Sequence, residues 1–226
     1  MPLARINGRL LHFIHIPKTG GSCVSSYLRA KGSLALYSRG RVDSSRTTPQ
    51  HMERASHSIL IPEGFADHSF AILRDPMDRL LSEYRYRALR RNRSCDLPTY
   101  IGPDDELTVE FDWDTEFHGS FDQWVAKIFS GHSSDPYLCD NHVRPQADFI
   151  SEQAQLFLFK NGLSEVFDWI DKVTGTHRQV IGLDHNASPQ FAIHMRDETR
   201  RMILEFYSED YRAISCVADA QIHAPA

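Results

Sequence analysis

The sequence predicts an α/β fold in three layers, with a central, mostly parallel sheet flanked by helices. Short apolar runs that match buried strands alternate with amphipathic segments of helical period. The first strand enters its helix through a glycine-containing turn, as in nucleotide-binding α/β folds. The chain has 226 residues, of which 41% are hydrophobic and 24% charged, an ordinary balance for one globular domain. We therefore expect a single domain over residues 1–226.

The expected strands are four short apolar runs. The clearest is the run at 10–16, which Pro17 ends. The others are residues 34–37, 70–73 and 156–159.

The expected helices follow from apolar stripes and end signals. Pro76 suits the first turn of a helix over 76–91, and Asp75 precedes it as an N-cap. The other expected helices are 22–31, 50–56 (opened by Pro49), 121–129, 163–173 and a final one that begins in 197–207. Residues 39–48 are polar and predict a loop, and 92–114, rich in acidic residues and proline, predicts an irregular excursion or flap.

Bulk properties exclude several classes of protein. A net charge of −5 gives no general attraction to nucleic acid, although seven arginines cluster within residues 74–93. No run of about 18 apolar residues could span a membrane, and the N-terminal residues lack the apolar core of a signal peptide. The four cysteines form no disulfide framework. These properties together predict a cytoplasmic protein.

The first chemical motif is the string Pro17-Lys18-Thr19-Gly20-Gly21-Ser22, which follows a strand and opens a helix. A helix N-terminus offers unpaired N–H groups and the positive end of a dipole, and both suit a phosphate group. The two glycines let the backbone approach the anion, Lys18 adds a cation, and Thr19 and Ser22 add hydroxyls. Lysine precedes the glycines, so this is not a Walker A loop. A tight structural turn is the alternative interpretation.

The second motif runs from Arg74 to Tyr84 and begins where the 70–73 strand ends. The carboxyl ends of parallel strands share one edge, so Arg74 is expected beside the Lys18 turn. Arginine can grip a phosphate bidentately, and the Ser82 hydroxyl could complete the site. The alternative is an Arg74–Asp78 pair at the helix start with Ser82 simply exposed. Two anion sites on one edge indicate a nucleotide with phosphates at both ends.

These two motifs resemble those of the glycan sulfotransferases, most closely the heparan sulfate 2-O- and 6-O-sulfotransferase group and its bacterial relatives. Strong similarity is confined to residues 13–28 and 70–86, and Ser22 stands where the family usually has threonine. The resemblance implies a P-loop-like fold with 3′-phosphoadenosine 5′-phosphosulfate (PAPS) as donor and 3′-phosphoadenosine 5′-phosphate (PAP) as product. It assigns the 5′ end of the donor to Lys18, Thr19, Gly20, Gly21, Ser22 and Cys23, and its 3′-phosphate to Arg74 and Ser82.

Sulfuryl transfer needs in-line positioning, charge stabilisation and a base, and we expect no metal. The histidines at 132, 142, 177 and 185 have no ligand-like spacing. In the similar 2-O-sulfotransferases the catalytic histidine precedes the arginine of the second motif by roughly twenty residues. His51 precedes Arg74 by 23 residues and His57 by 17, so His51 is the preferred base and His57 the second candidate. His15 is expected to be a core residue.

Two further segments have open roles. Residues 141–146 resemble segments of bacterial relatives that approach acceptor or nucleotide, and a plain polar loop fits equally well. Residues 184–188 match a late loop that closes over the nucleotide in this group.

The preferred function is thus sulfuryl transfer from PAPS to an acceptor hydroxyl on a carbohydrate, with His51 and Lys18 as catalytic residues. A non-catalytic nucleotide- or glycan-binding module with the same fold is the first alternative. A P-loop kinase is the second, and the missing Walker lysine argues against it.

Overall fold

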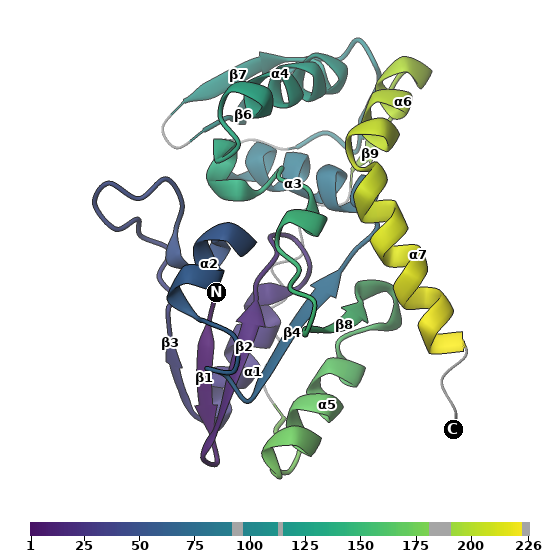
Figure 1. Ribbon diagram of the computed structural model, residues 1–226. Coiled ribbons are helices and arrows are strands. Elements are labelled where there is room, and N and C mark those ends of the chain that lie inside the picture. Colours follow the sequence, from purple (N-terminus) through teal and green to yellow (C-terminus); the bar gives the residue numbers. More distant parts are fainter. Residues whose placement is uncertain (92–96, 113–114, 181–190, 223–226) are drawn as a thin grey trace.

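The computed structural model describes residues 1–91, 97–112, 115–180 and 191–222. Within them the chain forms seven α-helices and a central five-stranded sheet (Figure 1). The strands lie in the order β3 (Ser33–Ala35), β1 (Leu3–Ile6), β2 (Arg9–Ile14), β4 (His68–Leu73) and β8 (Gln155–Leu158).

The sheet is mostly parallel, as predicted. Strand β4 pairs in parallel with β2 and with β8, whereas β1 is antiparallel to both of its neighbours. Strand β1 is therefore the one reversed strand. The three parallel strands end at the same edge, which places the residues that follow β2 and β4 next to each other.

Strand β1 was missed in the sequence, although the signal for it is present. Ile6 pairs with Arg9, so the two residues Asn7 and Gly8 form the hairpin turn. Their φ angles of 46° and 80° match a type I′ turn, for which Asn-Gly is the preferred pair. The predicted strand at 34–37 is found as β3, displaced toward the N-terminus.

Helices cover both faces of the sheet. Phe13 and Phe70 project to one face, where they pack against α1 (Gly21–Lys31) and α5 (Ser164–Thr174). Ile14 and Ala71 project to the other face, against apolar residues of α7 (Ser208–Ile222). Helix α2 (Arg54–Leu60) covers part of this second face, because the ring of His57 contacts that of His12 on β2.

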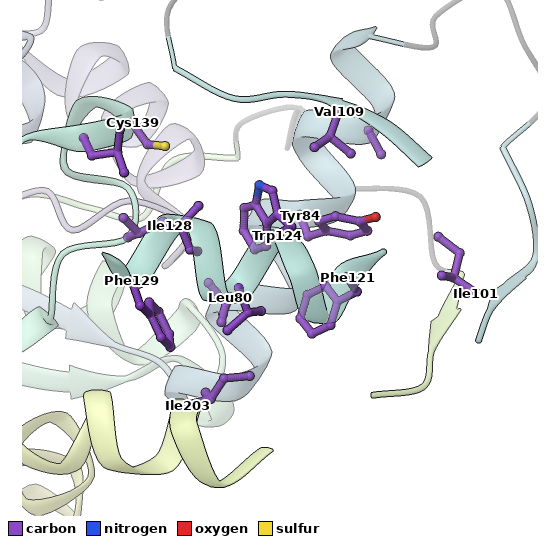
Figure 2. Packing of buried hydrophobic residues seen from close by; sticks show 14 of the residues in the cluster. Leu80, Tyr84, Ile101, Val109, Phe121, Trp124, Ile128, Phe129, Cys139 and Ile203 are labelled. Atoms are coloured by element: carbon purple, nitrogen blue, oxygen red, sulfur yellow. The ribbon is translucent and has the colours of Figure 1, made fainter. Parts of the chain in front are cut away.

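A second core lies beyond the carboxyl edge of the sheet (Figure 1). It joins α3 (Pro76–Arg91), α4 (Phe121–Ser134), α6 (Asp197–Phe206) and the hairpin of β6 (Leu107–Glu110) with β7 (Glu116–Gly119). Figure 2 shows Trp124 at its centre, with Tyr84 of α3 and Phe121 beside it. This core anchors helix α3, which carries the second motif.

The ends of α3 and α4 are fixed by the residues that flank them. Pro76 opens α3, and the Asp75 carboxylate accepts from the amide of Asp78 at 3.0 Å, which confirms the predicted cap. Helix α4 begins with a capping box of Ser120 and Gln123 and continues five residues beyond the predicted end at 129.

Two expectations on secondary structure were wrong. The predicted helix at 50–56 is broken into the 3₁₀ turn η1 (Pro49–His51) and α2, because Met52 and Glu53 adopt extended backbone angles. The expected irregular excursion at 92–114 contains β6 and the short strand β5 (Tyr100–Ile101), although residues 92–96 and 113–114 lie outside the described ranges. Val109 of β6 is buried in the second core, which gives that segment its regular structure.

The remaining elements are short. Strand β5 pairs with β9 (Ala192–Ile193), and three further 3₁₀ turns are η2 (Leu138–Asn141), η3 (Gln146–Asp148) and η4 (Phe159–Asn161). Cys23, Cys139 and Cys216 are free thiols. No helix in the described ranges is long and apolar enough to cross a membrane.

Replacement of Trp124 by alanine tests the second core. Trp124 is fully buried, so Trp124→Ala should lower the free energy of unfolding by about 3–5 kcal/mol, the usual cost of a large cavity. Urea denaturation measures this. The control is Ile59→Ala, at a side chain 81% exposed, which should change stability by about 0.5 kcal/mol or less. Equal effects of the two changes would contradict the assigned packing.

Candidate active site

The first motif forms the turn between β2 and α1 at the carboxyl edge of the sheet. Lys18 and Gly20 have φ angles of 67° and 87°, so the chain passes twice through the left-handed region. Gly21 is required for a different reason, since a Cβ there would lie 1.8 Å from Nε2 of His15. The glycines thus allow a tight turn packed directly on a histidine ring.

The amides of this turn point to anion binding. No acceptor for the amides of residues 19–22 occurs in the described part of the chain, as expected at a helix N-terminus. The Cys23 amide donates to Gly20 O at 3.1 Å and is already used. The Thr19 hydroxyl, expected to face the ligand, donates instead to Ile16 O at 2.8 Å in a fully buried position. Ser22 is half-buried on the first turn of α1.

Lys18 and Arg74 meet, as the shared edge predicted. The Arg74 guanidinium donates to the carbonyl of Lys18 at 3.1 Å, and the Lys18 ammonium lies 4.1 Å from the centre of the Tyr86 ring. Burial lowers the pKa of Lys18, and the nearby Glu83 carboxylate opposes that shift. Burial also lowers the pKa of Arg74.

Arg74 is held by a chain of buried hydrogen bonds. The Gln146 side chain accepts from the Arg74 amide at 3.0 Å and donates to its carbonyl at 2.8 Å, so it clamps both backbone groups of that residue. Asp210 of α7 in turn accepts from Gln146 and from the amide of Ala147. The C-terminal helix therefore fixes the backbone that presents Arg74.

Arg79 and Arg87 on helix α3 make structural contacts, and Ser82 lies on the same helix. Ser82 is buried on α3 rather than exposed. Arg79 is buried and donates to the carbonyls of His142 and Arg144, and Arg87 is paired with Glu83 at 2.6 Å. The arginine cluster is therefore largely bound within the molecule, because Arg90 and Arg91 pair with Glu110 and Glu116 respectively.

His51 is oriented by a carboxylate. Its Nδ1 lies 2.7 Å from Oδ2 of Asp140, which also accepts from the hydroxyl of Thr48 at 2.8 Å. The other oxygen of Asp140 accepts from the Thr48 amide at 2.6 Å and from the Thr47 hydroxyl at 2.7 Å. A carboxylate can only accept, so Nδ1 of His51 carries the proton and Nε2 keeps its lone pair.

The pKa values of this pair reflect burial and mutual attraction. Burial lowers the pKa of His51 to about 4, although the hydrogen bond to Asp140 raises it. Burial would raise the pKa of Asp140, but the hydrogen bond from His51 and the nearby histidines hold it well below its usual range. At neutral pH the pair is a neutral imidazole and a carboxylate.

Asp140 lies in an unusual turn. Cys139, Asp140 and Asn141 have φ angles of 61°, 56° and 62°, a left-handed conformation that costs energy at each residue. Neighbouring contacts hold them there: the Cys139 amide donates to Asp112 at 3.0 Å, and the Asn141 side chain donates to His51 O at 2.9 Å. Strain of this kind accumulates at functional sites.

His142 forms a second carboxylate–imidazole pair beside the first. Its Nδ1 lies 2.8 Å from Glu83, and the ring centres of His142 and His51 are 4.7 Å apart. Burial would raise the pKa of Glu83, but the charges of His142 and Arg87 hold it well below its usual range. Through Glu83 this pair connects the Lys18 turn to His51.

The other predicted residues have these positions. His57 lies apart, with Nε2 donating to Phe149 O, in the wall of a cavity of about 780 Å³. His15 is buried as expected, yet its ring contacts that of His51 at 4.9 Å.

Within residues 141–146, three side chains carry roles at the site, on Asn141, His142 and Gln146. Residues 184–188 lie outside the described ranges.

Sequence reasoning missed Asp140, Glu83 and Asp210. Asp140 opens the polar 141–146 segment, so the density of polar residues was the available signal. Glu83 lies in the second motif itself, between Ser82 and Tyr84. The absence of metal-ligand spacing was misleading as well, because folding brings His51, Asp140 and His142 together with ligand atoms within 4.8 Å.

A glycine-containing turn with Lys18, an arginine on the same edge and an oriented imidazole are the kinds of group that transfer from an anionic donor requires. The sulfotransferase family model matches residues 7–213, and the chain belongs to this family. The protein is therefore a transferase of sulfuryl groups to a hydroxyl-bearing acceptor, and the family generally uses PAPS and releases PAP. No curated protein and no solved structure matches the chain.

Replacement of Asp210 by asparagine tests the buried support of Arg74. An amide in place of the carboxylate would turn an N–H₂ toward donors of Gln146 and Ala147, so Asp210→Asn should cost about 1–3 kcal/mol of unfolding free energy. Urea denaturation checks this, with Asp219→Asn as the matched exposed change on the same helix. Wild-type stability of Asp210→Asn would refute the assigned network.

Proposed function

We propose that this chain transfers the sulfuryl group of PAPS to a hydroxyl of a carbohydrate acceptor. The observation that carries the proposal is the convergence of three groups. The anion-binding turn with Lys18 lies beside Arg74, and Glu83 with His142 connects it to the oriented base His51. A nucleotide fold alone would not need a neutral imidazole beside the anion site.

The donor would bind across the carboxyl edge of the sheet. In this proposal residues 18–22 form a P-loop-like turn, in which the amides of residues 19–22 and the Ser22 hydroxyl hold the 5′-phosphosulfate. Arg74 and Ser82 would bind the 3′-phosphate and reject nucleotides that lack it. Arg74 is well suited to this, because Gln146 fixes its backbone while its guanidinium forms no ion pair with a carboxylate in the described ranges.

The transfer itself would proceed in line. The acceptor oxygen forms a bond to sulfur while the bond from sulfur to the 5′-phosphate oxygen breaks, and the acceptor proton passes to Nε2 of His51. Asp140 stabilises the imidazolium that results. Lys18 would stabilise the negative charge that develops on the leaving oxygen, and PAP departs.

The acceptor would approach from the side of the Asp140 turn. A polar cavity of about 450 Å³ lies there, lined among others by Arg41, Arg46 and Tyr137. Its wall adjoins the base, since Asp112 of the same cavity binds the Cys139 amide next to Asp140. Polar side chains with an aromatic ring suit a hydroxyl-rich ligand, which supports a carbohydrate as acceptor.

Nucleotide preference tests the donor assignment. Isothermal titration calorimetry with PAP and with ATP, with and without Mg²⁺, should show tighter binding of PAP that is independent of the metal. Arg74→Ala should weaken PAP by about 10- to 100-fold, the loss of a charge-assisted contact, and leave adenosine 5′-phosphate nearly unaffected.

Two controls sharpen this titration. Arg212→Ala removes an exposed arginine of α7 that pairs with Glu209, and it should leave PAP affinity unchanged. Magnesium-dependent preference for ATP would refute the sulfotransferase assignment and favour a kinase.

Transfer activity tests the base. With ³⁵S-labelled PAPS and a panel of unsulfated glycans, His51→Ala should lose about 10²- to 10⁴-fold in rate, the usual contribution of a general base, and keep PAP affinity. Asp140→Asn should also lose rate, because it removes the charge beside the imidazolium and turns an N–H₂ toward groups that donate to Asp140. His57→Ala is the matched control. Full activity of His51→Ala together with loss in His57→Ala would move the base to His57, and PAP binding without transfer in the wild type would favour a non-catalytic module.

A further inference from the structure

The two carboxylate–imidazole pairs together have the composition of a metal site. His51, Asp140 and His142 offer ligand atoms that all lie within 4.8 Å of one another. Their side chains are 6%, 14% and 16% exposed, so the cluster is enclosed yet open to small solutes. These residues are far apart in sequence, and only the left-handed turn at 139–141 and η1 bring them together.

The hydrogen bonds leave one nitrogen available on each ring. Nδ1 of His51 is bonded to Asp140 and Nδ1 of His142 to Glu83, so each ring retains its lone pair on Nε2 when neutral. Neither Nε2 has a hydrogen-bond partner in the ranges that the structure describes. Histidines that bind metals typically donate their other N–H to a carboxylate in this way.

The donor set selects the class of ion. Two imidazole nitrogens, each on a ring paired with a carboxylate through its other nitrogen, suit Zn²⁺ and its neighbours Co²⁺, Ni²⁺ and Cu²⁺, whereas Mg²⁺ and Ca²⁺ prefer oxygen ligands. Two nitrogens at about 2.1 Å from one ion lie at most about 4.2 Å apart, and the ligand atoms of this cluster lie within 4.8 Å of one another. Asp140 and Glu83 provide two negative charges against the dication, and Arg87 and Lys18 also lie near Glu83.

We propose that a divalent transition metal ion of the Zn²⁺ class binds between His51 and His142 and reversibly blocks transfer. The ion would take the lone pair of His51 that otherwise accepts the acceptor proton, so binding and base catalysis exclude each other. The donor turn and Arg74 are not ligands, so PAP would still bind. The inhibitory consequence rests on the proposed function, whereas the metal site itself does not.

Metal binding is measured first, on tag-free protein freed of metals by chelation. Titration with Co²⁺ alone should give the visible absorption of a low-symmetry Co²⁺ complex at one ion per chain, and Zn²⁺ should displace it. His142→Ala should abolish the signal. Asp140→Asn should weaken binding by about 10- to 100-fold, as expected when a residue that orients a ligand is lost. His177→Ala, at an exposed histidine elsewhere, should match the wild type.

Thermal unfolding of each variant without metal establishes that it is folded. The lack of a Co²⁺ signal in the wild type, or equal affinities of the wild type and folded Asp140→Asn and His142→Ala, would overturn the site.

Zn²⁺ should also suppress transfer of ³⁵S from PAPS without altering PAP affinity, and chelation should restore it. Metal binding without inhibition would overturn the block. Metal binding by a chain that does not bind PAP would refute the proposed function and leave the metal site in place.

Discussion

The site depends on the Asp140 carboxylate, which accepts four hydrogen bonds from three residues. Two come from Thr48, one from Thr47 and one from His51. These bonds join the loop before η1 to the left-handed turn at 139–141, two segments about ninety positions apart in the chain. A buried carboxylate is costly unless its oxygens are satisfied, so the threonines are as necessary as the histidine. The hydrogen bond from Nδ1 of His51 to Asp140 also sets the tautomer of this base.

The proposed donor site, by contrast, depends on backbone conformation. The turn at 18–22 needs left-handed angles at Lys18 and Gly20 and the absence of a Cβ at Gly21, and the Arg74 backbone is fixed by Gln146 and Asp210. The two halves meet at Glu83, which binds His142 and Arg87 and lies near Lys18. Helix α3 thus carries Glu83 and begins two residues after Arg74, and the second core around Trp124 holds it in place.

The contrast between local and distant contacts explains what could be predicted from the sequence. The turn, the β4–α3 junction and the cap at Asp75 follow from neighbouring residues, and the parallel sheet then places Lys18 next to Arg74. The break after His51 and the left-handed turn at Asp140 do not follow, because each is stabilised by the other through long-range hydrogen bonds. Asn7-Gly8 is likewise a local signal, since it forms the turn of the β1–β2 hairpin. Spacing likewise could not reveal a cluster of His51, Asp140 and His142.

This arrangement has a chemical consequence for the base. Burial disfavours the imidazolium, while Asp140 favours it, and the balance leaves the pKa of His51 at about 4 without a bound ligand. A phosphosulfate at the neighbouring turn would add negative charge and so favour the imidazolium further. Because the His51 imidazole is neutral before the donor binds, it offers an unprotonated nitrogen to the acceptor. The same lone pair on His51, beside a second one on His142, would bind a divalent ion of the Zn²⁺ class. The geometry that favours proton transfer is therefore also the geometry that favours metal binding.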